Sequence, residues 1–347
     1  MRRALGTVGL CLLVAACGDD RPEAVDAPLA PPDGAPPVDA GVADAHPADA
    51  VPADAGAVSL TFAVVTDVHI GTGHDVYGGE EDDVTARARA AVARINAQAA
   101  VEPIDYVFIL GDVSDSAEPA ELAKAREILD DLSVPWVPLL GNHDVWTYTA
   151  TTEETAPTGD EQFIAEFGDR YAGLVWTSAP TWNPAGYTSH FVNFEIRVPG
   201  TVLLALDWNS REHAVPGYPG ALPEADLHDF GGGSFPWLET RLSVLPPSGR
   251  VIFLQHHPFR PMVPLPSWAA CFSSDEMAQF RAALAAAAPV DRYWGVFAGH
   301  LHRAYQGTAF DEWPTFAQIE TDASMDSGAV TLVHVPAVGA VDVSSLE

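Results

Sequence analysis

Five short groups of Asp, Asn and His residues carry the chemistry that can be recognised in this sequence. Each group comes directly after a short apolar segment. The groups are Asp67 and His69, Asp112 and Asp115, Asn142 to Asp144, His256 and His257, and His300 and His302. Carboxylate, amide and imidazole donors without a thiolate suit Zn, Mn or Fe. One such histidine would more often be structural, but five coincident groups favour a metal site.

Two of the groups have a spacing that suits joint binding of an ion. In an extended segment, residues i and i+2 point to the same side. Asp67 and His69 can therefore give an oxygen and a nitrogen to one ion. In the same way, His300 and His302 can place two imidazoles beside a pair of ions. A glycine precedes three of the groups, at positions 111, 141 and 299, where the backbone is expected to turn tightly.

The elements that must position these groups alternate between strands and helices. We expect strands at 60–66, 106–110, 136–140, 190–196, 202–206, 251–254 and 293–297, and helices at 83–99, 119–132, 235–244 and 275–288. Loops are expected at 145–186, 207–234 and 258–274. This alternation predicts an α/β fold in which crossover helices join parallel strands. In such sheets ligands bind outside the carboxyl ends of the strands, where the five groups are expected to lie.

The order of the groups resembles the motifs of the calcineurin-like metallophosphoesterases. The matching patterns are Asp-x-His, Gly-Asp-x-x-Asp, Gly-Asn-His-Asp, His-x-Pro and Gly-His-x-His, from about residue 60 to 305. Trp237-Leu238-Glu239, before Leu242, also resembles a helix of that family. The resemblance implies a metallophosphoesterase-type four-layer α/β/β/α sandwich. The strand pattern by itself indicates α/β but does not predict the second sheet.

The resemblance also implies which residues bind metal. One ion would be held by Asp67, His69, Asp112 and His302, and a second, sharing Asp112, by Asn142, His256 and His300. The first histidine of His256-His257-Pro258 matches the ligand, because the family pattern is His-x-Pro. The two ions would be divalent or trivalent Fe, Mn or Zn. Two divalent ions, two carboxylates and one hydroxide leave about one positive charge, which attracts a phosphate.

The same resemblance implies a hydrolytic mechanism in which the metals activate hydroxide. His143 would protonate the leaving oxygen, and Asp115 would bond its ring and fix its tautomer. In purple acid phosphatases a tyrosine stands at the position of Asp115, so the chain resembles other branches of the family. The implied activity is hydrolysis of small phosphate esters, with a phosphodiesterase as the first expectation. A phosphomonoesterase or nucleotidase is the alternative, and a non-catalytic surface-binding lipoprotein on the same scaffold is a rival from another class.

The composition limits the partners of the chain. Its 347 residues include 48 Asp plus Glu against 17 Lys plus Arg, for a net charge of −31. Such a chain repels a phosphate backbone, so a nucleic-acid polymer is not an expected partner. The three cysteines are too few for a disulfide framework. No run of about 18 apolar residues occurs, so we expect no spanning helix in the mature chain.

The N-terminus resembles a bacterial lipoprotein signal. Arg2 and Arg3 precede an apolar run, and Val14-Ala15-Ala16-Cys17 resembles the processing box in which the cysteine is lipidated. We expect a signal peptide at 1–17, an Ala/Pro/Asp-rich disordered linker at 18–57 and a metallophosphoesterase domain at 58–347. Lipid on Cys17 would anchor the exported protein to a membrane, and Gly18 favours the outer membrane.

Overall fold

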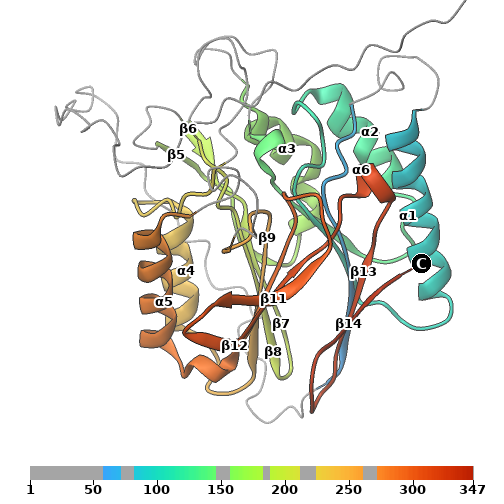
Figure 1. The fold of residues 1–347 in the computed structure, drawn as a ribbon. Coiled ribbons are helices and arrows are strands. Elements are labelled where there is room, and N and C mark those ends of the chain that lie inside the picture. Colours follow the sequence, from blue (N-terminus) through green and yellow to red (C-terminus); the bar gives the residue numbers. More distant parts are fainter. Residues whose placement is uncertain are drawn as a thin grey trace, which may run out of the picture.

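Two β-sheets face each other in the computed structural model of the chain, with helices on their outer sides (Figure 1). The structure describes residues 58–71, 82–145, 157–182, 188–211, 224–260 and 272–346. The first sheet has the order β14 (Asp342–Ser345), β13 (Thr331–Val335), β1 (Leu60–Val65), β2 (Tyr106–Leu110) and β3 (Trp136–Leu139). The second has the order β11 (Tyr305–Phe310), β12 (Trp313–Glu320), β10 (Tyr293–Ala298), β9 (Arg250–Gln255), β8 (Thr201–Leu206), β7 (Asn193–Val198) and β4 (Val175–Thr177). A separate hairpin pairs β5 (Pro180–Trp182) with β6 (Thr188–His190).

Helices cover both outer sides of the sheet pair. Figure 1 shows α1 and α2 beside the first sheet, and α4 and α5 on the opposite side of the molecule. The helices are α1 (Asp83–Ala99), α2 (Pro119–Leu129), α3 (Gly159–Phe167), α4 (Ser234–Ser243), α5 (Ser274–Ala287) and the short α6 (Ser324–Ser327). Single 3-10 turns occur at Asn142–Asp144, Gly168–Tyr171 and Val290–Arg292. The predicted four-layer α/β/β/α sandwich is confirmed by this arrangement. No helix among the described residues combines the length and the apolar character needed to cross a bilayer.

The central strands are apolar throughout because both of their faces are buried. On β8, Val202, Leu204 and Leu206 belong to the cluster packed under α4 and α5. Leu203 and Ala205 alternate with them and face the core between the two sheets. Since side chains of a strand alternate between its faces, one apolar run serves two cores.

Parallel pairing brings the strand ends that carry the site to one edge of the molecule. In the first sheet, β1 pairs in parallel with β2, and β2 with β3. In the second sheet, β8, β9, β10 and β12 are parallel neighbours. The prediction of parallel strands joined by helices is therefore right for β1 with β2, β2 with β3, β8 with β9 and β9 with β10, whereas the chain passes from β10 to β12 through the strand β11. The exceptions are antiparallel pairs, among them β7 with β8 and β1 with β13.

Several predicted element boundaries differ from the structure, and hydrogen bonds account for two of the differences. The strand predicted at 190–196 is interrupted after β6, because Asp207 accepts the N–H of Val192 and Arg211 donates to the carbonyl of His190. The strand predicted at 136–140 ends at Leu139, because the carbonyl of Leu140 accepts from the side chain of Asn209 at 2.8 Å. The helix predicted to reach residue 132 ends at 129.

The loop predicted at 145–186 contains a helix, α3, together with the short strands β4 and β5. Phe163 and Phe167 of α3 are fully buried and pack edge to face on each other at 4.8 Å between ring centres. The signal peptide, Cys17 and the linker at 18–57 lie outside the described residues, as does Cys271, so these assignments stay predictions.

Candidate metal centre

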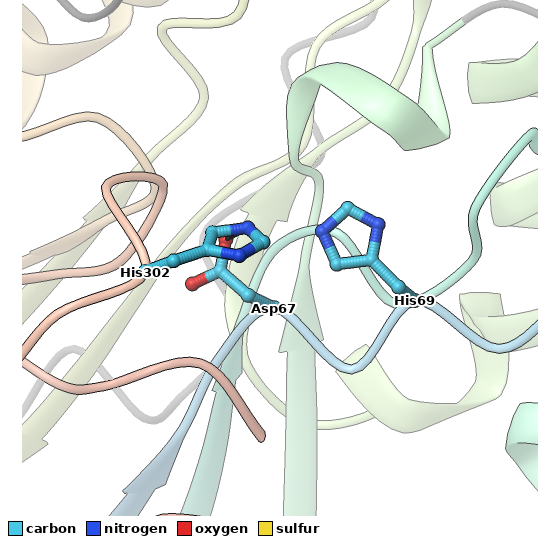
Figure 2. A group of neighbouring side chains, drawn as sticks. All are labelled: Asp67, His69 and His302. Atoms are coloured by element: carbon cyan, nitrogen blue, oxygen red, sulfur yellow. Dashed lines mark ion pairs between the residues drawn. The ribbon is translucent and has the colours of Figure 1, made fainter. Parts of the chain in front are cut away.

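The five predicted groups meet at the carboxyl ends of β1, β2, β3, β9 and β10. Their donor atoms form three overlapping clusters in which the atoms lie within 4.8 Å of one another. The clusters are Asp67, His69 and His302; His69, Asp112 and His143; and Asp112, His256 and His300. Figure 2 shows the side chains of the first cluster converging from the end of β1 and from the loop after β10.

Asp112 joins two of these clusters through one carboxylate oxygen. Its Oδ2 lies 3.4 Å from Nε2 of His69 and 3.2 Å from Nε2 of His256. Its Oδ1 accepts the backbone N–H of His143 at 2.9 Å. The side chain is buried, and two imidazoles from opposite sheets approach the same oxygen. This is the position expected of a carboxylate shared between two ions.

Asp67 is the carboxylate of the cluster that also contains His69 and His302. Its Oδ1 lies 3.4 Å from Nε2 of His302. The Thr66 hydroxyl donates to Oδ2 at 2.7 Å, and the backbone N–H of His300 lies 3.0 Å from both carboxylate oxygens. The carboxylate is therefore held by neutral donors, and its Oδ1 also faces the imidazole of His302.

Asn142 and His256 lie together on the far side of Asp112. The amide oxygen of Asn142 is 3.1 Å from Nε2 of His256. The other ring nitrogen of His256 is 2.8 Å from the carbonyl of Leu110, and because a carbonyl only accepts, that nitrogen carries the proton. Nε2 is left as the donor atom for an ion. His257 is also buried, but its ring packs against His300 at 4.3 Å, and His256 is the member of the pair that joins the Asp112 cluster.

The imidazoles of His69 and His302 also direct Nε2 toward carboxylates, those of Asp112 and Asp67. Nδ1 of His69 lies 3.3 Å from Oδ1 of Asp115, and Nδ1 of His302 lies 3.3 Å from Oδ2 of Asp326. An oxygen acceptor behind each ring holds it in the orientation that a metal ligand needs. Asp326 was not predicted, because it lies 24 residues after the last motif and the sequence around it matches no metal-binding motif.

The backbone at these positions is strained. Seven non-glycine residues of the described chain have positive φ, and five of them are proposed ligands: Asp67, His69, Asp112, His300 and His302. Left-handed φ in a residue with a Cβ costs free energy and is concentrated at functional sites. The glycines are needed for close approach, since a Cβ on Gly141 would lie 2.1 Å from Oδ1 of Asp112, and one on Gly299 would lie 2.5 Å from Oδ2 of Asp67.

The electrostatics of the cluster favour bound cations. Burial opposes protonation of His69, but the neighbouring carboxylates, Asp115 first among them, outweigh burial and raise its pKa to about 9. Burial likewise opposes protonation of His256, whose pKa is raised to about 9 mainly by Asp112. For Asp112, burial would raise the pKa, but the histidines hold it well below its usual range. Surroundings that stabilise positive charge this strongly, with nitrogen and oxygen donors only, fit divalent transition-metal ions.

His143 and Asp115 lie together as predicted, but through a different atom of Asp115. Nδ1 of His143 is 2.7 Å from the backbone carbonyl of Asp115, whereas the Asp115 carboxylate is 3.9 Å from that nitrogen and closer to His69. The expected contact between Asp115 and the His143 ring is therefore present, and it is made through the backbone carbonyl of Asp115.

The chain is similar to proteins of one phosphoesterase family. The sequence model of the family described as calcineurin-like phosphoesterase matches residues 60–304. A protein of Rhodopseudomonas palustris named as a probable cyclic nucleotide phosphodiesterase is 25% identical over 249 residues, which are 72% of this chain and 73% of that protein. Among solved structures, a dimetal phosphatase from Danio rerio is 15% identical with a TM-score of 0.47, covering 83% of this chain and 98% of its own. The calcineurin-like phosphoesterase YfkN of Bacillus subtilis is 13% identical with a TM-score of 0.46, covering 84% and 91%.

Proposed function

Because the chain belongs to the calcineurin-like phosphoesterase family, and is thus a metal-dependent hydrolase of phosphoric esters, we propose that it hydrolyses small phosphodiesters at a dinuclear centre built around Asp112. One observation carries the proposal. A single oxygen of Asp112 lies 3.4 Å from Nε2 of His69 and 3.2 Å from Nε2 of His256, which come from different sheets. A carboxylate that lies between two imidazoles can be shared by two ions, each bound by one of the imidazoles.

Seven residues of this chain would hold the two ions. Asp67, His69, Asp112 and His302 would bind one, and Asp112, Asn142, His256 and His300 the other. Such ions supply an activated water as nucleophile and positive charge for the phosphoryl oxygens. From the chemistry of the donors, the two ions would be Fe, Mn or Zn.

His143 is the group proposed to deliver a proton to the leaving oxygen. Its Nδ1 faces a carbonyl, which can only accept, so Nδ1 keeps its proton and Nε2 is the atom that can exchange one. A quarter of the side chain is exposed, whereas the proposed ligands His69 and His256 are buried. His143 can therefore reach a substrate that approaches from solvent, and Asp115 positions its ring through the backbone.

The diester preference is supported by the similarity to the Rhodopseudomonas palustris protein, whose name is that of a cyclic nucleotide phosphodiesterase. A phosphomonoesterase or nucleotidase is the second candidate. It is favoured by the N-terminal secretory pattern, because an exported enzyme would meet exogenous phosphomonoesters more often than cytosolic cyclic nucleotides. The non-catalytic rival predicts loss of a ligand, and all seven proposed positions are filled.

The location of the enzyme is a further part of the proposal. The signal-like residues 1–17 and the lipidation pattern at Cys17 support an exported lipoprotein at the outer membrane. A linker at 18–57 would separate the anchor from the catalytic domain. The membrane is then a partner through lipid alone, besides the small phosphate-ester substrate.

Metal analysis of the purified full chain, paired with an ester panel, tests the proposal. We expect about two transition-metal ions per chain and faster hydrolysis of bis(p-nitrophenyl) phosphate than of p-nitrophenyl phosphate. Asp112→Ala should lose metal and activity together, whereas Asp83→Asn, an exposed acid on α1, should lose neither. Full activity without metal after exhaustive chelation would refute the dinuclear centre. Faster cleavage of the monoester would favour the second candidate.

A further inference from the structure

The segment around α6 packs against the end of β1 that carries Asp67. The backbone N–H of Ser324 donates to the carbonyl of Thr66, and that of Met325 donates to the carbonyl of Asp67, both at 2.9 Å. The family match ends at residue 304, so this segment lies outside the matched region. It nevertheless forms hydrogen bonds with the backbone of a proposed metal ligand.

Helix α1 holds the same segment from the other side. The guanidinium of Arg87 donates to the carbonyl of Met325 at 2.5 Å, and that of Arg94 donates to the carbonyl of Gly328. Gly328 ends α6 with a φ of 65°, a conformation that glycine adopts without strain. Because β1 and α1 both bond this backbone, the place of Asp326 within it is well determined.

Asp326 uses this place to contact His302. Its Oδ2 lies 3.3 Å from Nδ1 of His302, and Nε2 of the same ring lies 3.4 Å from Oδ1 of Asp67. The imidazole is thus held between two carboxylates. His69 has the same environment, with Asp115 behind its Nδ1, whereas the neutral carbonyl of Leu110 lies behind Nδ1 of His256.

We propose that Asp326 is a positioning residue for the ion bound by Asp67, His69, Asp112 and His302. Its carboxylate fixes the ring orientation of His302 and makes Nε2 a stronger donor, which increases the affinity of that site. The inference rests on the proposed dinuclear centre and adds to it a residue from outside the matched region. Asp326 is a positioning residue and not a catalytic one, because it acts through His302.

Zinc binding to the full chain, measured by competition with a chromophoric chelator, tests this role. Asp326→Ala should weaken the binding of one of the two zinc ions by about 10–100-fold and leave the affinity for the other unchanged. Asp326→Asn keeps an oxygen acceptor without the charge, so its affinity should fall between those of the alanine variant and the original chain. Asp322→Ala is the matched control, since the carboxylate of Asp322 accepts from the Ser327 hydroxyl and its loss should leave both affinities unchanged.

His302→Ala separates the two proposals. If it retains both zinc ions at full affinity, the metal assignment fails, and the role of Asp326 fails with it. If His302→Ala loses one ion while Asp326→Ala binds zinc as the original chain does, only the role of Asp326 is overturned. Unfolding in excess chelator is the structural readout: a midpoint much lower for Asp326→Ala than for Asp322→Ala would show that Asp326 serves folding instead.

Discussion

The buried carboxylate of Asp144 accepts both the backbone N–H and the hydroxyl of Ser114, at 2.9 and 2.7 Å. Its other oxygen accepts the N–H groups of Val113 and Gly141. One side chain therefore joins the loop after β2, which carries Asp112, to the loop after β3, which carries Asn142. The burial of this carboxylate, helped by the charge of Asp112, raises its pKa even though four groups donate to it.

Asp144→Ala should destabilise the protein strongly. It leaves three buried N–H groups without an acceptor, and each unpaired group costs about 1–3 kcal/mol. Ser114→Ala is the matched comparison, because it keeps Asp144 and its three N–H donors and leaves one N–H, that of Ala117, without its acceptor, so it should cost roughly 1–3 kcal/mol. Urea unfolding measures both, and metal analysis should show a larger loss for Asp144→Ala. Equal effects of the two substitutions would contradict the joining role of Asp144.

The raised pKa values of His69 and His256 predict how the stability of the chelator-treated protein depends on pH. A histidine with a raised pKa in the folded state stabilises it fully below the unfolded value of 6.5. That contribution is lost as the pH rises through about 9. The free energy of unfolding in excess chelator should therefore fall across this window, as followed by urea titrations.

Substitution identifies the groups responsible. His256→Gln should flatten this dependence, whereas His334→Gln on β13, where the ring lies beside the Thr61 hydroxyl, should preserve it. Zinc affinity should change in the opposite direction and increase with pH, because a metal replaces the protons on both imidazoles. A zinc affinity independent of pH between 6.5 and about 9 would contradict the assignment of His69 and His256 as ligands.

Much of the fold could be predicted from the sequence because local signals agree with tertiary packing there. The helix expected at 83–99 is α1 with the same bounds, since Asp82 caps it and apolar residues recur at helical spacing. The second sheet could not be derived from alternation alone, because strands buried on both faces read the same in one sheet or two. The helix α3 was missed because Phe163 and Phe167 are its main buried apolar residues, too few for a helical pattern.

The residues of the site were also predictable only in part. Ligand candidates were predictable because strand ends and i, i+2 spacing are local features. Their supporting contacts were not, since the carbonyl of Leu110 behind His256 is a backbone atom and has no sequence signature. Asp326 behind His302 is brought near only by the pairing of β12 and the packing of α6.

A buried ion-pair network behind the site yields a prediction on stability. Arg211 lies between Asp207, at 2.6 Å, and Asp160, at 3.4 Å, and all three side chains are at most 2% exposed. Arg211→Ala leaves two buried carboxylates without their cation and should cost roughly 3–5 kcal/mol. The exposed pair of Arg89 and Glu127 is the control, and Arg89→Ala should cost about 0–1 kcal/mol. Urea unfolding would contradict the prediction if the two costs were similar.

Membrane attachment should depend on Cys17, which lies outside the described residues. Cys17→Ser should move the protein from the membrane fraction to the soluble fraction and leave its specific activity unchanged. Cys11→Ser is the matched control, because it removes a thiol from the apolar run and preserves the processing pattern. Fractionation after carbonate washing measures the outcome, and a Cys17→Ser variant that stays with the membrane would contradict lipidation.

Asn142 and His143 are adjacent, and their substitution should have different consequences. The amide oxygen of Asn142 lies 3.1 Å from Nε2 of His256 in the proposed metal centre, so Asn142→Ala should lower metal content and turnover together. His143→Ala should leave the metal content near that of the original chain. If His143 protonates the leaving oxygen, its loss should slow hydrolysis of an alkyl phosphodiester by about 10²–10⁴-fold.

The leaving group then separates acid catalysis by His143 from a role in binding phosphate. A nitrophenolate leaves without protonation, so His143→Ala should slow a nitrophenyl diester far less than an alkyl diester. Steady-state rates on the two esters, with metal content measured on the same samples, test this difference. Equal losses on both esters at full metal content would mean that His143 positions the phosphate, since binding a phosphate does not depend on how basic the leaving oxygen is.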